Sequence, residues 1–180
     1  MIRKWWTENV GASALLALLR IYLGWQWLVP GWHKLTGDTP FDASGFLTNA
    51  INNPVVEKGS GALVYPTFTA FINNFALPNV KLINFLIPLG EFLVGLGLML
   101  GCLTIAATFF GLLMNIMFMF AGTVSTNPWL MLLGFLVIAG GANAGRFGLD
   151  YYVRPLLRKG WNKLKHRGTP TGTNRPVQAG

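Results

Sequence analysis

Four long apolar stretches dominate the chain, and polar segments separate them. They cover about residues 10–32, 82–100, 104–121 and 129–147. As a helix, each stretch is long enough to cross about 30 Å of hydrocarbon. The connections 101–103 and 122–128 are short, so the last three stretches are expected to be antiparallel neighbours. The pattern predicts an all-α fold, a four-helix transmembrane bundle.

Residues 33–81 form a long polar connection between the first two stretches. Asp42 or Ser44 is placed to cap a short helix. Further on, apolar residues recur at helical spacing, at Phe68, Phe71, Ile72 and Phe75. We expect two short amphipathic helices over the outer mouth of the bundle. They could pack against lipid or form a functional lid.

Composition supports the membrane class. The chain is 52% hydrophobic and 11% charged, whereas soluble domains have about 25% charged residues. We expect one membrane domain over residues 1–160, with a retained first span because no small-residue cleavage site follows it. Residues 161–180 are basic and then rich in Gly, Pro and Thr, which predicts a disordered tail. The single Cys102 excludes an intramolecular disulfide and a thiol shuttle, and is expected to be a packing residue.

Positive charge gathers at the two ends of the chain. Of the 14 Lys and Arg, seven lie between residues 154 and 175, and Arg3 and Lys4 add two more. The connection 33–81 balances three lysines with three acids. The positive-inside rule therefore predicts a multi-pass protein of the plasma membrane with both termini in the cytoplasm. The basic tail is expected to lie against anionic lipid, which contributes about 1 kcal/mol of binding free energy per cation. The sequence contains no recognisable nucleic-acid-binding module, so no nucleic acid is expected as a partner.

Small and polar residues share one face of each predicted span at 100° per residue. The faces comprise Arg20, Gly24, Trp27, Gly31 and Lys34; Asn84, Pro88, Glu91 and Gly95; Thr108, Gly111, Asn115 and Gly122; and Gly140 with Asn143, followed one turn on by Arg146. Such faces make helix–helix contacts in membranes. Each span is therefore expected to turn its polar side inward.

Arg20 and Glu91 are the charged residues nearest the middle of the first two spans. A charge at the bilayer centre costs about 2.5–3.5 kcal/mol on insertion scales. Because the spans are antiparallel, we expect an Arg20–Glu91 ion pair near the midplane, with Asn115 hydrogen-bonded to either residue. The pair could be purely architectural. Alternatively, it could line a polar pocket in which Arg20 binds a ligand carbonyl or anion and Glu91 exchanges protons.

Cofactor motifs are not legible in the sequence. His33 and His166 are predicted on opposite sides of the membrane, which excludes a bis-histidine haem inside the bundle. No flavin, iron–sulfur or metal motif, catalytic triad or phosphate loop is found. His33, next to Lys34, is expected to be an interfacial residue, or else a proton relay at the mouth of the pocket.

A family resemblance is carried by four stretches in order: LRIYLGWQWLVPGWHKL, FDASGFLTNAI, IPLGEFLVGLGLMLG and NPWLMLLGFLVIAGGANAGRFGLDYY. Over about residues 13–158 the chain resembles the DoxX/DoxD family of small bacterial membrane proteins. The resemblance implies a four-helix membrane bundle. It also implies links to thiosulfate:quinone oxidoreductase in the archaeal DoxD branch, and to oxidoreductase complexes and thiol or oxidative stress in bacteria. The family pattern falls on Arg20, Trp27, Lys34, Glu91, Asn115, Asn127, Arg146 and Asp150.

Two hypotheses follow. In the first, the protein is a membrane subunit of a quinone-linked oxidoreductase that takes electrons from a redox partner or a small donor. Glu91 and Arg20 would be its catalytic residues, and its ligand-binding residues would be Trp27, Asn115, Lys34, His33, Asn143 and Arg146. In the second, the protein is not an enzyme, but a small-solute or anion carrier using Arg20, or a scaffold for a soluble partner.

Overall fold

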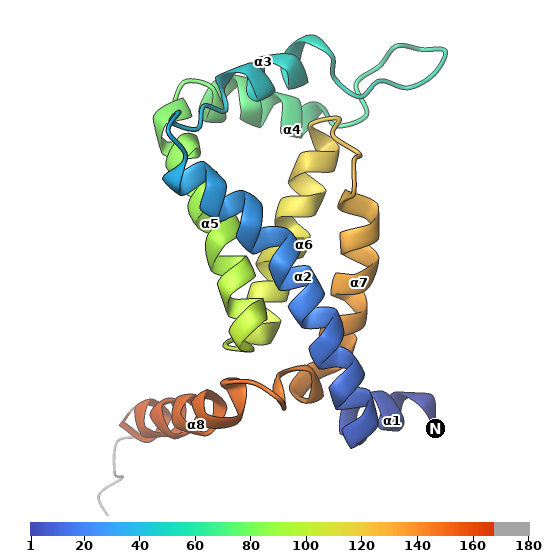
Figure 1. The fold of residues 1–180 in the computed structure, drawn as a ribbon. Coiled ribbons are helices and arrows are strands. Elements are labelled where there is room, and N and C mark those ends of the chain that lie inside the picture. The colour runs from blue at the N-terminus through green and yellow to red at the C-terminus, as the bar shows by residue number, and fades with distance from the viewer. Residues whose placement is uncertain (168–180) are drawn as a thin grey trace, which may run out of the picture.

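The computed structural model describes residues 1–167, with side chains as far as Asn162, as an all-helical fold (Figure 1). Four long helices stand side by side: α2 (Val10–Thr36), α5 (Val80–Leu100), α6 (Thr104–Phe120) and α7 (Asn127–Ala139). At one end, here called the terminal end, α1 (Ile2–Glu8) and α8 (Asp150–Arg167) lie crosswise. At the other, the loop end, α3 (Ser44–Asn52), α4 (Pro66–Phe71) and a π-helical turn (Ile72–Ala76) cover the bundle.

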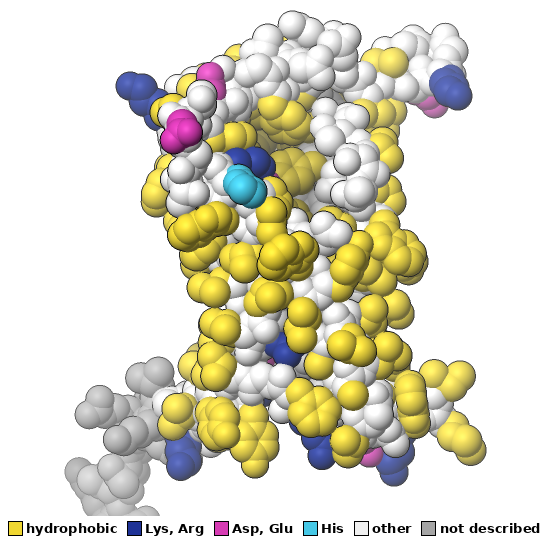
Figure 2. All heavy atoms as spheres, in the orientation of Figure 1, with side chains coloured by type: hydrophobic (Ala, Val, Ile, Leu, Met, Phe, Trp, Pro, Cys, Tyr) yellow, Lys and Arg dark blue, Asp and Glu magenta, His cyan; other side chains and the backbone are white. Residues whose placement is uncertain are grey.

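The surface of the bundle is that of a membrane protein. Helices α2 and α5 are long and apolar enough to cross a membrane, and α6 and α7 are apolar but shorter. In Figure 2, hydrophobic side chains cover the middle of the visible face, and most charged side chains lie toward the two ends. An apolar belt between charged ends is what a lipid environment selects.

Local signals explain where several helices begin and end. The Asn9 side chain accepts hydrogen bonds from the backbone N–H groups of Gly11 and Ala12 at 2.7 and 3.3 Å, which separates α1 from α2. The predicted cap of the first loop helix by Asp42 or Ser44 is wrong, because Ala43 is the N-cap of α3; Asp42 instead accepts from the backbone N–H of Ser44 at 3.0 Å. Gly101, at φ +63°, ends α5 in the left-handed conformation.

Helices α2 and α5 pack through glycines. A Cβ atom on Gly24 would overlap Met99, one on Gly31 would overlap Phe92, and one on Gly95 would overlap Leu28. Small residues let helix backbones approach closely, and the contact then allows few registers. The three contacts therefore determine which residues of α2 and α5 face each other.

Two apolar clusters hold the fold together. The first fills the middle of the bundle and includes Leu16, Leu23, Trp27, Val94, Leu98, Leu133 and Val137. The second lies under the loop helices and comprises Ala43, Leu47, Ala50, Ile72, Ala76 and Ala121. The helices predicted within the 33–81 connection are thus confirmed, and they pack on the end of the bundle.

Some predicted boundaries are wrong. The first long helix continues to Thr36, and the fourth ends at Ala139 instead of residue 147. A 3-10 helix (Gly141–Gly145) follows it, because Gly141 turns the chain at φ +55°. Residues 161–167, expected in a disordered tail, belong to α8. The rest of the predicted tail, 168–180, lies outside the described residues.

Candidate functional site

Glu91, the one carboxylate of the four long helices, is paired with a lysine. Lys34 Nζ donates to both carboxylate oxygens of Glu91, at 2.6 and 2.7 Å. The Glu91 side chain is 4% exposed and that of Lys34 is 29% exposed. Lys34 Nζ also lies 5.1 Å from the centre of the Phe41 ring, a cation–π distance. A buried charge requires such partners, so the lysine is what allows Glu91 to lie inside the bundle.

The predicted Arg20–Glu91 pair is wrong. Gly31 faces Phe92, and Arg20 precedes Gly31 by eleven residues. At 1.5 Å per residue, Arg20 lies about 16 Å further along α2. The prediction aligned the two helices by their midpoints, whereas the glycine contacts shift them by several turns. Arg20 is therefore at the terminal end, and it does not meet Glu91.

Arg20 closes the terminal end of the bundle. The side chain is 1% exposed, and its Nη1 and Nη2 donate to the carbonyl oxygens of Leu98 and Phe147, at 2.9 and 2.8 Å. A Cβ atom on Gly101 would overlap the guanidinium. The guanidinium is thus enclosed by the turn after α5 and the segment before α8, which is a structural position.

Asp150 holds the same turn from the other side. It is 1% exposed and accepts from the backbone N–H groups of Leu103 and Thr104 at 2.7 and 3.0 Å. These donors begin α6, so Asp150 caps that helix from a distant part of the chain. Its own N–H donates to the Gly101 carbonyl oxygen at 2.7 Å. The family-pattern residues Arg20 and Asp150 therefore both stabilise the α5–α6 turn.

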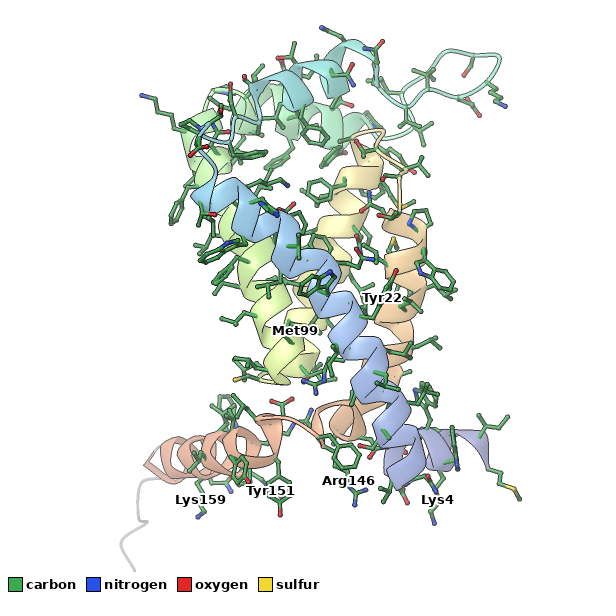
Figure 3. All side chains as sticks on the ribbon, in the orientation of Figure 1. Lys4, Tyr22, Met99, Arg146, Tyr151 and Lys159 are labelled. Carbon is green, nitrogen blue, oxygen red and sulfur yellow. The ribbon has the colours of Figure 1, made fainter. Side chains whose placement is uncertain are left out.

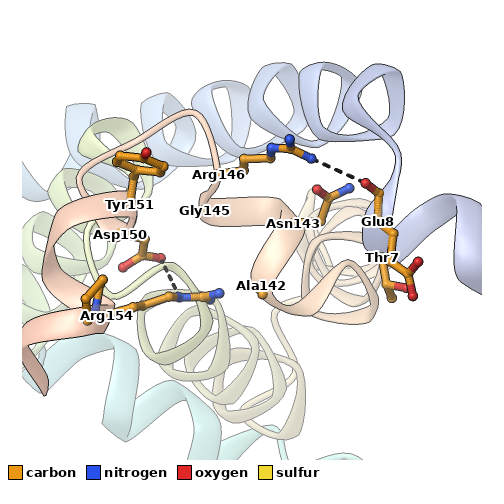
Figure 4. A pocket seen from close by; sticks show the side chains of 10 residues that line it. Thr7, Glu8, Ala142, Asn143, Gly145, Arg146, Asp150, Tyr151 and Arg154 are labelled. Carbon is orange, nitrogen blue, oxygen red and sulfur yellow. Dashed lines mark hydrogen bonds and ion pairs between the residues drawn. The ribbon is translucent and has the colours of Figure 1, made fainter. Parts of the chain in front are cut away.

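Asn143 and Arg146 also lie at the terminal end, away from Glu91. Asn143 Nδ2 donates to the carbonyl oxygens of Trp6 and Asn9, at 3.0 and 2.9 Å. Arg146 donates to the Glu8 carbonyl oxygen at 3.3 Å. Both line an open cleft of about 410 Å³ between α1 and α8 (Figure 4). Their contacts join α1 to the chain after α7, so the structure does not place these two predicted ligand-binding residues with Glu91.

Trp27 and Asn115 lie between the two ends. Trp27 is 5% exposed, and its ring stacks on Phe118 with centres 6.4 Å apart. Asn115 is 1% exposed, and its Oδ1 has no hydrogen-bond partner among the described residues. The predicted bond from Asn115 to Arg20 or Glu91 is therefore wrong. A void of about 10 Å³ lies between Trp27, Thr108 and Asn115, room for about one water molecule.

An apolar cavity of about 230 Å³ lies at the loop end. Its walls come from α3, α4, the π-helical turn, α5 and α6, and include Phe46, Phe68, Ile72, Ile87, Met114 and Phe118. Ile87 is one helical turn from Glu91 on the same face of α5. Phe118 is the ring that stacks on Trp27. This cavity, hereafter the loop-end cavity, has neither Lys34 nor Glu91 in its walls, and Ile87 is the wall residue that lies one turn from Glu91.

The loop-end cavity adds residues that the sequence did not single out. Phe46, Met114 and Phe118 look like ordinary apolar residues until α3 is packed on α5 and α6. His33, in contrast, was singled out but is exposed in the last turn of α2. Figure 2 shows the surface hollowed below the loop helices, with Lys or Arg and His side chains at its edge. The described residues contain no group of three or more His, Cys, Asp and Glu that could bind a metal ion.

Comparison with known proteins identifies the family. The family model described as DoxX matches residues 15–124, more than half of the chain. The matched segment includes Lys34, Glu91 and the loop-end cavity, whereas Asn143 and Asp150 follow it. No curated protein and no solved structure matches the chain. The chain therefore belongs to the DoxX family of membrane proteins.

Proposed function

We propose that this protein is a membrane subunit of a quinone-linked oxidoreductase, and that the quinone ring binds in the loop-end cavity beside Lys34 and Glu91. One observation carries the proposal: a buried ion pair lies one helical turn from an apolar cavity with aromatic walls. A site for a small molecule combines a mostly apolar lining with a few placed polar groups. The loop-end cavity and the ion pair provide both.

The size and lining of the cavity fit a quinone ring. Its volume of about 230 Å³ is below the range of about 300–1,000 Å³ for drug-sized ligands. It would enclose one ring with small substituents, and a prenyl tail would lie outside. Phe46 and Phe118 offer aromatic faces to the ring. A tail would follow the exposed apolar residues of α5, such as Leu82 and Phe85.

Lys34 and Glu91 supply the polar chemistry. A quinone that becomes a quinol takes up two electrons and two protons. Lys34 Nζ would donate a hydrogen bond to a ring carbonyl oxygen, which is where negative charge develops. Glu91, a carboxylate in the pair with Lys34, would take up each of the two protons from water in turn and pass it to the reduced ring. The electrons would come from a partner protein or from a small reduced donor, thiosulfate or a thiol.

The proposal includes the orientation in the membrane. Helices α2, α5, α6 and α7 would cross the bilayer, with α7 at 13 residues spanning the thinnest part, since short helices thin the bilayer locally. The basic terminal end would face the cytoplasm. The loop-end cavity would then open toward the outer leaflet of the plasma membrane. An anion carrier built on Arg20 receives no support, because the guanidinium donates to two carbonyl oxygens at the opposite end.

Quinone content tests the proposal. Protein purified in mild detergent is extracted with solvent, and quinone per protein is measured by mass spectrometry against the lipid background. Three variants address the site: Glu91→Gln, Lys34→Met, and Ala76→Leu, which fills the cavity. Two matched controls, Glu57→Gln and Lys58→Met, make the same kinds of change at exposed residues between α3 and α4.

We expect near-stoichiometric quinone in the wild type and both controls, and a several-fold loss in the three site variants. Each variant is first checked for folding by its elution in gel filtration. Quinone at the lipid background in the wild type would overturn the proposal. If Ala76→Leu retains as much quinone per protein as the wild type, the quinone binds outside the loop-end cavity.

A further inference from the structure

Helix α8 carries an apolar face that the protein does not cover. Its exposed apolar residues include Leu156, Leu157 and Trp161, at 66%, 55% and 71% exposure. The same helix has six Lys and Arg in its sequence and one acid, Asp150, which is buried at the α5–α6 turn. A strongly amphipathic helix with a basic polar face is typical of helices that lie in a membrane surface.

The apolar and basic faces of α8 point in the directions that a helix in the membrane surface requires. In Figure 3, Tyr151 and Lys159 point away from the bundle. At 100° per residue, Leu157 lies about 160° around the helix from Lys159. The apolar face therefore looks toward the level of the bundle, where a bilayer surrounding α2 and α5 would be, and the basic face looks toward water.

Hydrogen bonds hold the N-terminal end of α8 against the α5–α6 turn, and they set the direction in which the helix runs. The backbone N–H groups of Leu149 and Asp150 donate to the carbonyl oxygens of Leu100 and Gly101, at 3.1 and 2.7 Å. The Asp150 carboxylate also caps α6. Figure 1 shows the helix running crosswise from this anchor, along the end of the bundle. The helix thus extends sideways beyond the other helices, and its apolar face is left uncovered.

We propose that α8 lies in the bilayer surface at the terminal end and binds anionic lipid headgroups. Leu157 and Trp161, each about 160° around the helix from Lys159, would enter the boundary between headgroups and acyl chains. Arg158 and Lys159 would contact phosphate groups of anionic lipids, whereas Arg154 Nε lies 3.7 Å from the Asp150 carboxylate and stays with the bundle. A second copy of α8 is a poor occupant of this face, since each copy brings six cations. This inference does not depend on quinone binding.

Site-directed spin labelling of the full chain in vesicles tests this inference. In a Cys102→Ser background, a single cysteine at position 157 or 159 carries a nitroxide. Its accessibility to oxygen, which gathers in lipid, and to a water-soluble nickel complex is measured. The vesicles are phosphatidylcholine alone, or phosphatidylcholine mixed with phosphatidylglycerol. We expect several-fold higher oxygen-to-nickel accessibility at position 157 than at position 159, and a further rise at 157 when phosphatidylglycerol is present.

A charge variant and a matched control identify the cause. With the label at 157, Arg158→Gln combined with Lys159→Gln should reduce the response to phosphatidylglycerol several-fold, and so should high salt. Lys58→Gln combined with Lys81→Gln removes the same charge at the loop end and should leave the response intact. If the label is equally exposed to the nickel complex at positions 157 and 159, the inference is overturned. It is also overturned if position 157 is protected from both oxygen and the nickel complex, because such protection indicates contact with protein. An identical result in the two lipid mixtures would overturn the recognition of anionic lipid.

Discussion

Lys34 Nζ lies 2.6 Å from Glu91 Oε1, and this contact joins the last turn of α2 to the middle of α5. Arg20, on the same face of α2 by sequence, instead binds carbonyl oxygens at the terminal end. The two cations of α2 therefore have separate roles. One holds a buried carboxylate beside an apolar cavity, and the other closes the end of the bundle.

The Lys34–Glu91 pair should respond unequally to loss of each partner. Lys34→Met leaves a buried carboxylate without a partner, which typically costs about 3–5 kcal/mol. Glu91→Gln should cost less, because Lys34 is partly exposed and can reach water. Thermal unfolding in detergent, followed by circular dichroism, measures the difference. If the two variants lose equal free energy of unfolding, Lys34 does not act by compensating the buried charge of Glu91.

Gly101 should be the more sensitive of two glycines with positive φ. Gly101 and Gly141 have φ values of +63° and +55°, so alanine at either costs about 1–2 kcal/mol of backbone strain. Alanine at 101 would also displace the Arg20 guanidinium, whereas position 141 has open space. We expect Gly101→Ala to lower the melting temperature clearly more than Gly141→Ala. If the two shifts are equal, the enclosure of Arg20 contributes nothing to stability.

Two buried asparagines form a matched pair. Asn143 Nδ2 donates to the carbonyl oxygens of Trp6 and Asn9, so Asn143→Leu removes both bonds, leaves Asn9 with only the Ser13 N–H, and should destabilise the fold by about 1–3 kcal/mol. Asn115 Oδ1 has no partner in the described chain, so Asn115→Leu should be neutral or stabilising. The free energies of unfolding of both variants in detergent check this. A loss at Asn115 equal to that at Asn143 would reveal a partner for Asn115, such as bound water or ligand.

The hydrogen bonds that Asp42 accepts at the start of α3 should weaken in acid. Hydrogen bonds from the Ser44 side chain, the Ser44 backbone and Asn84 hold the pKa of Asp42 below its ordinary value of 3.8. A carboxyl with a lowered folded-state pKa stabilises the fold above the unfolded-state pKa, and this contribution is lost as pH falls through the folded-state value. We therefore expect melting temperature to fall below about pH 4 in the wild type, and less steeply in Asp42→Asn. Asp38→Asn, an exposed control, should keep the wild-type slope; if it flattens equally, Asp42 is not the group responsible.

Much of the architecture follows from the sequence by itself. Apolar stretches longer than fifteen or so residues have few stable forms other than helices in a bilayer, so the four long helices were predictable. Apolar residues at helical spacing, such as Phe68, Phe71 and Phe75, act over a few positions, so the loop helices were predictable too. The family could also be recognised, because its motif residues are local in the sequence.

The pairing of charges was decided by tertiary structure. Helical periodicity places Arg20 and Lys34 on one face of α2, but it does not say which residue of α5 stands opposite. Glycine contacts such as that of Gly31 with Phe92 select one register, and close packing of backbones cannot be read from the period of a single helix. The loop-end cavity arises in the same way, since Phe46 and Phe118 meet only when α3 packs on α6. The sequence by itself determined the helices and their polar faces, and only the packed bundle decided which charges and rings lie together.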